Sequence, residues 1–193
     1  TSTFNVRFAD SQGFYLSNGM IASANLIGDA ASPYPVFPEI LIPAGGRIGI
    51  DIQDKRDISK EAGATIMLGD QGSSEFWDKA TQLIGNPHII IDDGSHRSED
   101  QLLTFDMLWP RLRDNGLYIV EDIHTSYREA YGGGLNNPDS FVEFTKRGID
   151  AMHSSEHGGK GDSHLFSVQV YPNLAVFEKR APHTWGGSTM RPS

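Results

Sequence analysis

The sequence predicts one α/β domain built on a mainly parallel sheet, and three observations lead to this class. Apolar runs with strand-like composition alternate with segments of helical periodicity, several of the runs are apolar on both faces, and the last two follow each other closely. Strands that are apolar on both faces are typical of parallel sheets covered by helices on two sides. We therefore expect a mainly parallel sheet with an antiparallel hairpin at its C-terminal end.

Each expected strand is a short apolar run that ends in a polar residue or a turn. RIGIDIQ carries Asp51 near its end, HIIIDD ends in two aspartates, and the last two runs are joined by Tyr171-Pro172-Asn173. The expected strands cover residues 22–28, 47–53, 64–71, 88–93, 115–122, 164–170 and 173–180.

The clearest helix is expected over residues 73–85. Ser73 is a suitable N-cap, Gly85 is a suitable stop, and Phe76, Ala80 and Leu83 share one face. The other expected helices cover residues 98–112, with an interruption near Pro110, and 139–155, and a short one begins near Pro38.

The 193 residues suffice for one domain with a sizeable core. We expect a loose N-terminal segment over residues 1–21, the domain over 22–180, and a C-terminal tail over 181–193. No internal repeat is visible.

Composition excludes several classes of function. The net charge is −9 with no basic cluster, which disfavours nucleic acid as a partner, because that affinity comes largely from Lys and Arg. The absence of Cys removes disulfides, thiolate metal sites and cysteine nucleophiles, and is compatible with the cytoplasm. No apolar run approaches the roughly 20 residues of a membrane span. We expect a cytoplasmic protein with a small-molecule partner, and a homo-oligomer stays open.

Acidic residues follow four of the expected strands. In parallel sheets ligands bind beyond the carboxyl ends of the strands. The sequence therefore predicts that these acids line one edge of the sheet: Asp51, Asp70, Asp92, Asp93, Glu121 and Asp122.

Asp51 lies 23 residues after Gly28, at the position where Rossmann-type sites use an acid to bind ribose hydroxyls. The alternative is that Asp51 caps its own loop. The loop that follows the first expected strand has a single glycine, which disfavours a pyrophosphate and better suits a ligand without phosphate. Asp70 and Gln71 either bind the edge of a base or form a turn before the helix.

Asp93, Glu121 and Asp122 have no basic neighbour in sequence and would repel one another if they converge. A hard divalent cation such as Mg²⁺ is the simplest compensation. His96 would then lie beside the ion as a general base, since imidazole exchanges protons near neutral pH. The alternative is that the acids cap helices and His96 is a surface residue. His124 either contacts substrate or has a structural role.

Several motifs together resemble one enzyme family. IDIQDK, GDQGSSEFW, IIIDDGSH, LWPRLRDNGLYIVEDIHTSY and YGGG resemble the macrocin and mycinamicin sugar O-methyltransferases and their cephalosporin-hydroxylase-like relatives. The resemblance covers about residues 26–180. One departure lies at the end of the first strand, where the family has an acid-x-Gly strand end and a Gly-Gly-Ser loop. This chain has Leu26-Ile27-Gly28 followed by Asp-Ala-Ala-Ser-Pro.

The resemblance implies a Rossmann-like class I methyltransferase fold, with S-adenosylmethionine and Mg²⁺ as cofactors. It also implies methyl transfer to a sugar hydroxyl of a natural product in antibiotic biosynthesis. Carried over to this sequence, it implies Asp93, Glu121 and Asp122 as metal ligands and His96 as the catalytic base. The residues expected at the cofactor are Gly28, Asp51, Asp70, Gln71 and Asp92, and those expected at the substrate are His124 and Tyr127.

Three other functions stay open at this point. The acceptor hydroxyl could belong to a phenol or catechol instead of a sugar. An iron hydroxylase is disfavoured, because such sites use two histidines and one carboxylate, whereas acids outnumber histidines here. A binding protein without catalysis would account for the changed glycine loop.

Overall fold

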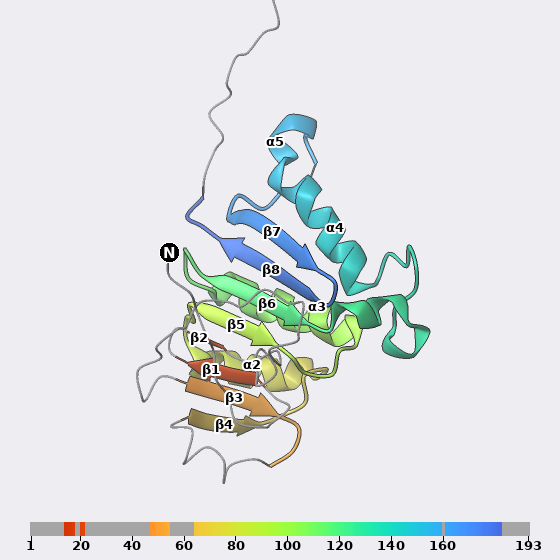
Figure 1. Cartoon of the computed structure of the whole chain (residues 1–193). Helices are drawn as coiled ribbons and strands as arrows, with labels where there is room; N and C mark the ends of the chain where they lie inside the picture. Colours follow the sequence, from red (N-terminus) through yellow and green to blue (C-terminus); the bar gives the residue numbers. More distant parts are fainter. Residues whose placement is uncertain (1–13, 18–19, 22–46, 55–63, 160, 183–193) are drawn as a thin grey trace, which may run out of the picture.

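The structure is a computed structural model of the chain and describes residues 14–17, 20–21, 47–54, 64–159 and 161–182 (Figure 1). Its strands are β1 Phe14–Ser17, β2 Met20–Ile21, β3 Arg47–Asp51, β4 Ala64–Leu68, β5 Ile89–Asp92, β6 Leu117–Glu121, β7 Leu165–Tyr171 and β8 Leu174–Lys179. Its α-helices are α2 Ser74–Ile84, α3 Ser98–Leu108, α4 Phe141–Met152 and α5 Ser154–His157, and its short 3-10 helices are η1 Trp109–Arg111, η2 Ile123–Tyr127 and η3 Glu129–Tyr131.

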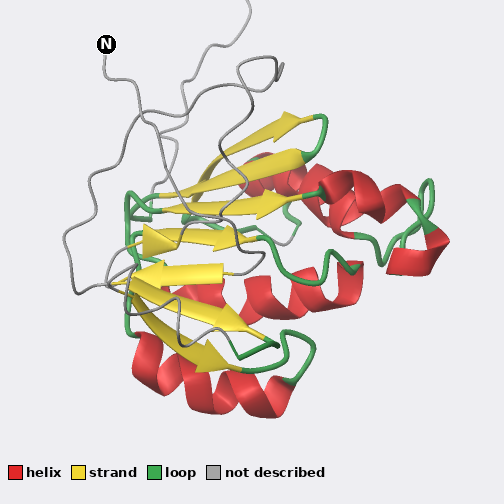
Figure 2. Cartoon of the chain, turned by 60° about the horizontal axis from the view of Figure 1, so that its bottom comes forward, coloured by secondary structure: helices red, strands yellow, loops and turns green. Residues whose placement is uncertain are grey.

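The strands form two four-stranded sheets that lie side by side in one layer (Figure 1). Their orders are β2-β1-β3-β4 and β5-β6-β8-β7, and β1 and β2 contact β5. The β3–β4 and β5–β6 pairs are parallel. In Figure 2 the helices of the described chain cover one face of this strand layer.

The α/β class and the C-terminal hairpin are confirmed, but the sheets are mixed and not mainly parallel in the described residues. Strand β1 pairs antiparallel with both β2 and β3, and β8 pairs antiparallel with both β6 and β7. The expected loose segment over residues 1–21 therefore contains two strands. A segment without a sustained apolar period can still pair through its backbone, which explains why the pattern did not reveal them.

Most of the expected elements in the described residues are confirmed within a few residues. The strand expected over 22–28 and the helix expected near Pro38 lie outside the described residues, as does most of the tail. Pro110 lies in η1, directly after α3, so the interruption of that helix is confirmed. The segment expected as one helix over 139–155 divides into α4 and α5 at His153.

Helix α2 has its expected ends, and its buried face overlaps the predicted one only in part. Ser73 accepts a hydrogen bond from the Phe76 N–H, and Gly85 ends the helix with a φ of 71°. Trp77, Ala80, Thr81 and Ile84 are the buried residues, whereas Leu83 is 73% exposed. The predicted face is therefore wrong for Leu83, whereas Ala80 is buried and Phe76 packs against the core. Trp77 decides the orientation, because its indole N–H donates to the Gln71 carbonyl at 2.8 Å.

The core next to α3 is aromatic and joins helices to strands. The Phe105 ring lies 5.1 Å from Trp109, 4.8 Å from Tyr118, 4.9 Å from Phe144 and 5.0 Å from Phe177. Such pairs each stabilise a fold by about 0.5–1.5 kcal/mol beyond the burial of their area. This packing fixes α3 and α4 against β6 and β8, and so holds the carboxyl end of β6 in place.

Among the described residues, no helix combines the length and apolar character that crossing a bilayer requires.

Candidate metal and cofactor site

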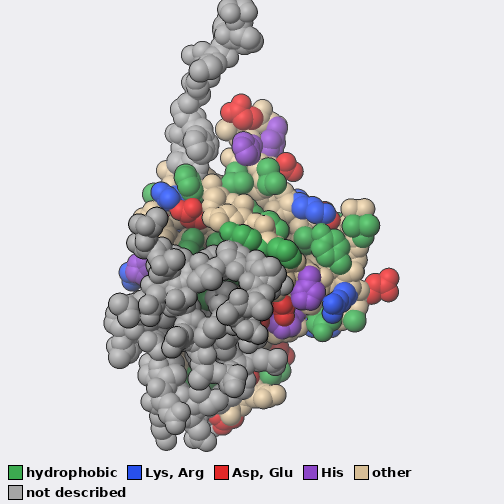
Figure 3. All heavy atoms as spheres, in the orientation of Figure 1, with side chains coloured by type: hydrophobic (Ala, Val, Ile, Leu, Met, Phe, Trp, Pro, Cys, Tyr) green, Lys and Arg blue, Asp and Glu red, His purple; other side chains and the backbone are tan. Residues whose placement is uncertain are grey.

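Strands β3, β4, β5 and β6 point in the same direction, so their carboxyl ends meet at one edge of the strand layer (Figure 1). Acidic and histidine side chains gather at the surface near this edge (Figure 3). The expectation that acids at the strand ends share one edge is therefore confirmed for the strands that the structure describes.

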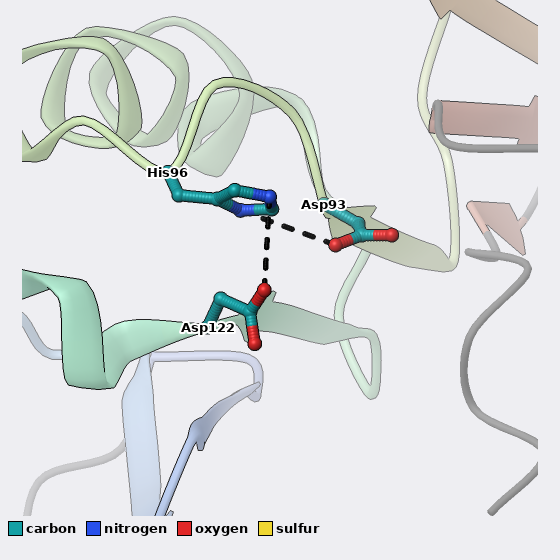
Figure 4. A group of neighbouring side chains, drawn as sticks. All are labelled: Asp93, His96 and Asp122. Atoms are coloured by element: carbon teal, nitrogen blue, oxygen red, sulfur yellow. Dashed lines mark ion pairs between the residues drawn. The ribbon is translucent and has the colours of Figure 1, made fainter.

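Three side chains come together at the ends of β5 and β6. Asp93, His96 and Asp122 each offer a ligand atom within 4.8 Å of the other two. The His96 Nδ1 lies 4.0 Å from an Asp93 carboxylate oxygen, and its Nε2 lies 3.7 Å from an Asp122 carboxylate oxygen (Figure 4). Both distances are too long for hydrogen bonds. The three side chains therefore lie near one another without hydrogen bonds between these atoms.

His96 and Asp122 both have a left-handed backbone, with φ values of 58° and 53°. The only other non-glycine residues with positive φ in the described chain are Asn115 and Asn136, and asparagine tolerates this region well. Such conformations cost about 1–3 kcal/mol each and tend to cluster at functional sites. Two of the three residues in the group, His96 and Asp122, thus have a backbone conformation of the kind that functional sites often show.

The group fits a hard divalent cation. Two ligands of an octahedral Mg²⁺ ion, each at about 2.0–2.1 Å, lie about 2.9 Å apart when adjacent and about 4.2 Å apart when opposite. Asp93 and Asp122 each offer a carboxylate oxygen within 4.8 Å of the other, close to this spacing. The Asp93 side chain is buried, while those of His96 and Asp122 are 24% and 35% exposed. A cation would therefore lie against a buried acid and face solvent on its other side.

Glu121 is not one of the three converging residues. It is the last residue of β6 and is 8% exposed, and its main-chain carbonyl accepts a hydrogen bond from the Gln101 side chain at 3.2 Å. Its role as a third metal ligand stays a prediction.

The two residues expected at the substrate lie on η2, directly after Asp122. The His124 Nδ1 is 3.7 Å from the Asp122 carboxylate, and the His124 side chain is 39% exposed. Tyr127 is 48% exposed. Both side chains are accessible on the segment that follows Asp122, and their contact with substrate stays a prediction.

Gln71 and Asp92 form a buried connection between the turn after β4 and the loop after β5. The Gln71 Nε2 donates to both Asp92 carboxyl oxygens at 2.9 Å, and its Oε1 accepts the Ser95 N–H at 2.8 Å. Burial raises the pKa of Asp92 to about 8, so this carboxyl is largely neutral at neutral pH. Both side chains are thus engaged inside the protein, and their predicted contact with the cofactor stays untested.

Asp51 and Asp70 stand at the ends of β3 and β4. An Asp51 carboxylate oxygen accepts the Gln53 N–H at 2.8 Å, and an Asp70 carboxylate oxygen accepts the Gly72 N–H at 2.9 Å. Both acids therefore cap local turns, which was the alternative interpretation of each. Their predicted cofactor contacts stay open, and Gly28 lies outside the described residues.

Thr125 is a contact of the site that the sequence analysis missed. Its hydroxyl lies 2.8 Å from the main-chain carbonyls of both His96 and Asp122. No motif or spacing reveals this contact, because the two carbonyls belong to different strand ends.

Among solved structures, the fold of this α/β chain, with acids at one edge of its strand layer, is similar to that of methyltransferases. The methyltransferase MycE of the mycinamycin pathway, in complex with Mg and SAH, superposes with a TM-score of 0.67 at 30% identity, over 75% of this chain and 40% of MycE. Its complex with Mg, SAH and mycinamycin VI gives 0.64 at 32% identity, over 69% and 36% of the two chains.

The particular relatives are sugar O-methyltransferases of natural-product pathways. The chain is 36% identical to the 8-demethyl-8-alpha-L-rhamnosyl tetracenomycin-C 2'-O-methyltransferase of Streptomyces olivaceus, over 72% of this chain and 39% of the relative. It is 33% identical to the mycinamicin VI 2''-O-methyltransferase of Micromonospora griseorubida, over 71% and 37%. The family resemblance inferred from the motifs is confirmed.

The match to these relatives is partial. The chain spans about two fifths of the length of each of the two. No protein-family model matches the sequence.

Proposed function

We propose that this chain carries the S-adenosylmethionine- and Mg²⁺-dependent site of an O-methyltransferase that acts on a sugar hydroxyl of a natural product. The observation that carries the proposal is the convergence of Asp93, His96 and Asp122 at the strand ends. The relatives named above support the reaction and the acceptor class, and the solved MycE complexes contain Mg together with SAH, the product of S-adenosylmethionine.

Asp93 and Asp122 are the residues that would hold Mg²⁺, with Glu121 as a further candidate. Carboxylate oxygens are the ligands that Mg²⁺ prefers, and the ion normally keeps several water positions open. When bound, Mg²⁺ would orient the acceptor hydroxyl and make its proton more acidic. The single histidine in the group of two acids also argues against the two-histidine pattern of an iron hydroxylase.

His96 would take the proton of the acceptor hydroxyl. The Nδ1 is buried and without a hydrogen-bond partner, so Nε2 is the nitrogen that would accept the proton. S-adenosylmethionine would supply the methyl group: the bond from its sulfonium sulfur to the methyl carbon would break as the bond from the sugar oxygen to that carbon forms. Because the His96 side chain is 24% exposed, the resulting imidazolium would be partly solvated.

S-adenosylmethionine would lie along the ends of β3 and β4, where Asp51 and Asp70 stand. An acid at the end of β3 is well placed to accept hydrogen bonds from ribose hydroxyls. The acidic surroundings also favour a cofactor with a positively charged sulfonium.

The His96→Asn variant tests the proposed base. Asparagine tolerates the left-handed backbone of this position better than alanine, so the loop should keep its shape. We expect methyl transfer from labelled S-adenosylmethionine to a glycosylated acceptor to fall roughly 10²–10⁴-fold. Mg²⁺ affinity should stay close to that of the wild type, because the acids remain.

Removal of Mg²⁺ by a chelator is the second part of this test. Transfer should stop in EDTA and return when Mg²⁺ is added. A His96→Asn variant that loses Mg²⁺ affinity along with rate would show that His96 is a metal ligand and not the base. Full activity in EDTA would contradict the metal requirement.

A further inference from the structure

Thr125 joins the two residues of the site that have the strained backbone. It lies on η2, three residues after Asp122, and is 3% exposed. Its hydroxyl oxygen is 2.8 Å from the His96 carbonyl, 29 residues away in sequence, and 2.8 Å from the Asp122 carbonyl. One hydroxyl therefore bridges the loop after β5 and the turn after β6.

The bonding favours the His96 side of this bridge. A hydroxyl has a single proton and can donate to one carbonyl at a time. The Asp122 carbonyl already accepts the Thr125 main-chain N–H at 2.9 Å. The hydroxyl therefore donates its proton to the His96 carbonyl. This bond fixes the orientation of the peptide group that follows His96.

The orientation of this peptide decides where the imidazole points. His96 has a φ of 58°, which is unfavourable for a residue with a Cβ, so neighbouring contacts must hold it. If the loop relaxed to negative φ, the imidazole would turn away from the two acids. The 3.7 Å distance between His96 and Asp122 thus depends on a contact made by neither side chain.

We propose that Thr125 is a positioning residue of the metal and base site, and that its hydroxyl, by joining the loop that carries Asp93 to the turn that carries Asp122, holds these two acids in the geometry that binds the cation. This inference rests on the proposed function and extends it to a residue that would not touch substrate, cofactor or metal. Groups that orient metal ligands from behind typically change metal affinity by 10–100-fold when they are removed.

The test compares three single variants with the wild type. Thr125→Val removes the hydroxyl and keeps the branched shape, and Thr125→Ser keeps the hydroxyl. Thr81→Val is the matched control, because Thr81 is also 3% exposed and its hydroxyl donates to a main-chain carbonyl, that of Trp77, at 2.8 Å within α2. The probe is Mn²⁺ alone, with the free ion counted by electron paramagnetic resonance, and thermal unfolding is measured on the same samples.

We expect Thr125→Val to bind Mn²⁺ roughly 10–100-fold more weakly, whereas Thr125→Ser and Thr81→Val bind it like the wild type. Both valine variants lose a buried hydroxyl bond, so their melting temperatures should fall alike, and only the metal affinity separates them. Mn²⁺ affinity unchanged in Thr125→Val, or reduced equally in Thr81→Val, would overturn the inference. A wild type that binds no Mn²⁺ would overturn the metal site itself.

If Thr125→Val does not fold, Thr125→Ala takes its place, with Thr125→Ser as the variant that keeps the hydroxyl. A serine variant that binds Mn²⁺ as tightly as the wild type, beside an alanine variant that binds it roughly 10–100-fold more weakly, supports the bridge. A folded serine variant with Mn²⁺ affinity as low as that of Asp122→Asn contradicts it.

Discussion

At the scale of single residues, Asp122 combines the side chain of a proposed metal ligand with a left-handed backbone. Successive side chains of a strand point to opposite faces, and the φ of 53° at Asp122 breaks this alternation directly after β6. The turn brings its carboxylate to the loop after β5, where Asp93 and His96 lie. The strained residue is therefore the one that closes the site.

The Asp122→Asn variant isolates the charge of this residue. Asparagine keeps the shape and tolerates positive φ, so the fold should survive. We expect Mg²⁺ affinity, measured by calorimetry, to fall by at least roughly tenfold, because one of the anionic ligands becomes neutral. Asp78→Asn, on the exposed face of α2, should leave the affinity unchanged. Equal affinity in wild type and Asp122→Asn would remove Asp122 from the metal site.

At the scale of elements, Gln71 ties the end of β4 to the loop after β5. Its side-chain amide donates to the Asp92 carboxyl and accepts the Ser95 N–H. Its main-chain carbonyl accepts the indole N–H of Trp77 in α2. A second contact runs in parallel, because Ser95 donates to Asp100 at 2.6 Å, and the Asp100 carboxylate packs against Gly72. The proposed cofactor turn and metal loop thus form one connected unit.

The Gln71→Leu variant should destabilise this unit. It removes the Gln71 bonds to the buried Asp92 carboxyl and to the Ser95 N–H, and such a loss costs about 1–3 kcal/mol. We expect urea denaturation to show a decrease of that size in the free energy of unfolding. Gln82→Leu is the control, since Gln82 is exposed on α2 and bonds only within its own helix among the contacts described. A loss of similar size in both variants would contradict a special role for Gln71.

Lys179 ties β8 to the turn after α3 and gives the fold a pH dependence. Its Nζ donates to the Trp109 carbonyl at 2.8 Å, and burial lowers the pKa of Lys179 below its ordinary value of 10.5. In the window between the lowered pKa and 10.5, the unfolded chain binds more protons than the folded chain. The contribution of Lys179 to stability therefore rises with pH across this window and is complete above it.

Measuring unfolding of the wild type and of Lys179→Met at several alkaline pH values checks this sign. We expect the difference in free energy of unfolding between the two to grow in favour of the wild type as pH rises toward 10.5. A difference that stays constant or shrinks would show that burial does not lower the pKa of Lys179.

Local signals predicted most elements, and contacts between distant segments account for what they missed. Ser73 and Gly85 predicted the ends of α2 because caps act on the nearest turn. The buried face of α2 depends on the bond from Trp77 to Gln71, which the helical period does not contain. The acids at the strand ends were predictable from the two apolar runs, whereas the contact from Thr125 to His96 was not.

At the scale of the whole molecule, ligand binding should stabilise the folded chain. A ligand at 100 times its dissociation constant adds about 2.7 kcal/mol, and for a domain of this size each kcal/mol raises the melting temperature by about 2–4 °C. We expect Mg²⁺ and S-adenosylhomocysteine each to raise the melting temperature of the wild type. EDTA should cancel the rise caused by Mg²⁺. The Asp122→Asn variant should lose the rise caused by Mg²⁺ and keep the rise caused by S-adenosylhomocysteine. Equal shifts in wild type and variant would place the ion elsewhere.

The most direct test of the central claim is a crystal structure of this chain with Mg²⁺ and S-adenosylhomocysteine. We expect the ion to lie between Asp93 and Asp122, with carboxylate oxygens at about 2.0–2.1 Å. The ribose should lie on Asp51, and His96 should face the open side of the ion without binding it. An ion bound away from these acids, or S-adenosylhomocysteine bound away from the ends of β3 and β4, would contradict the proposed site.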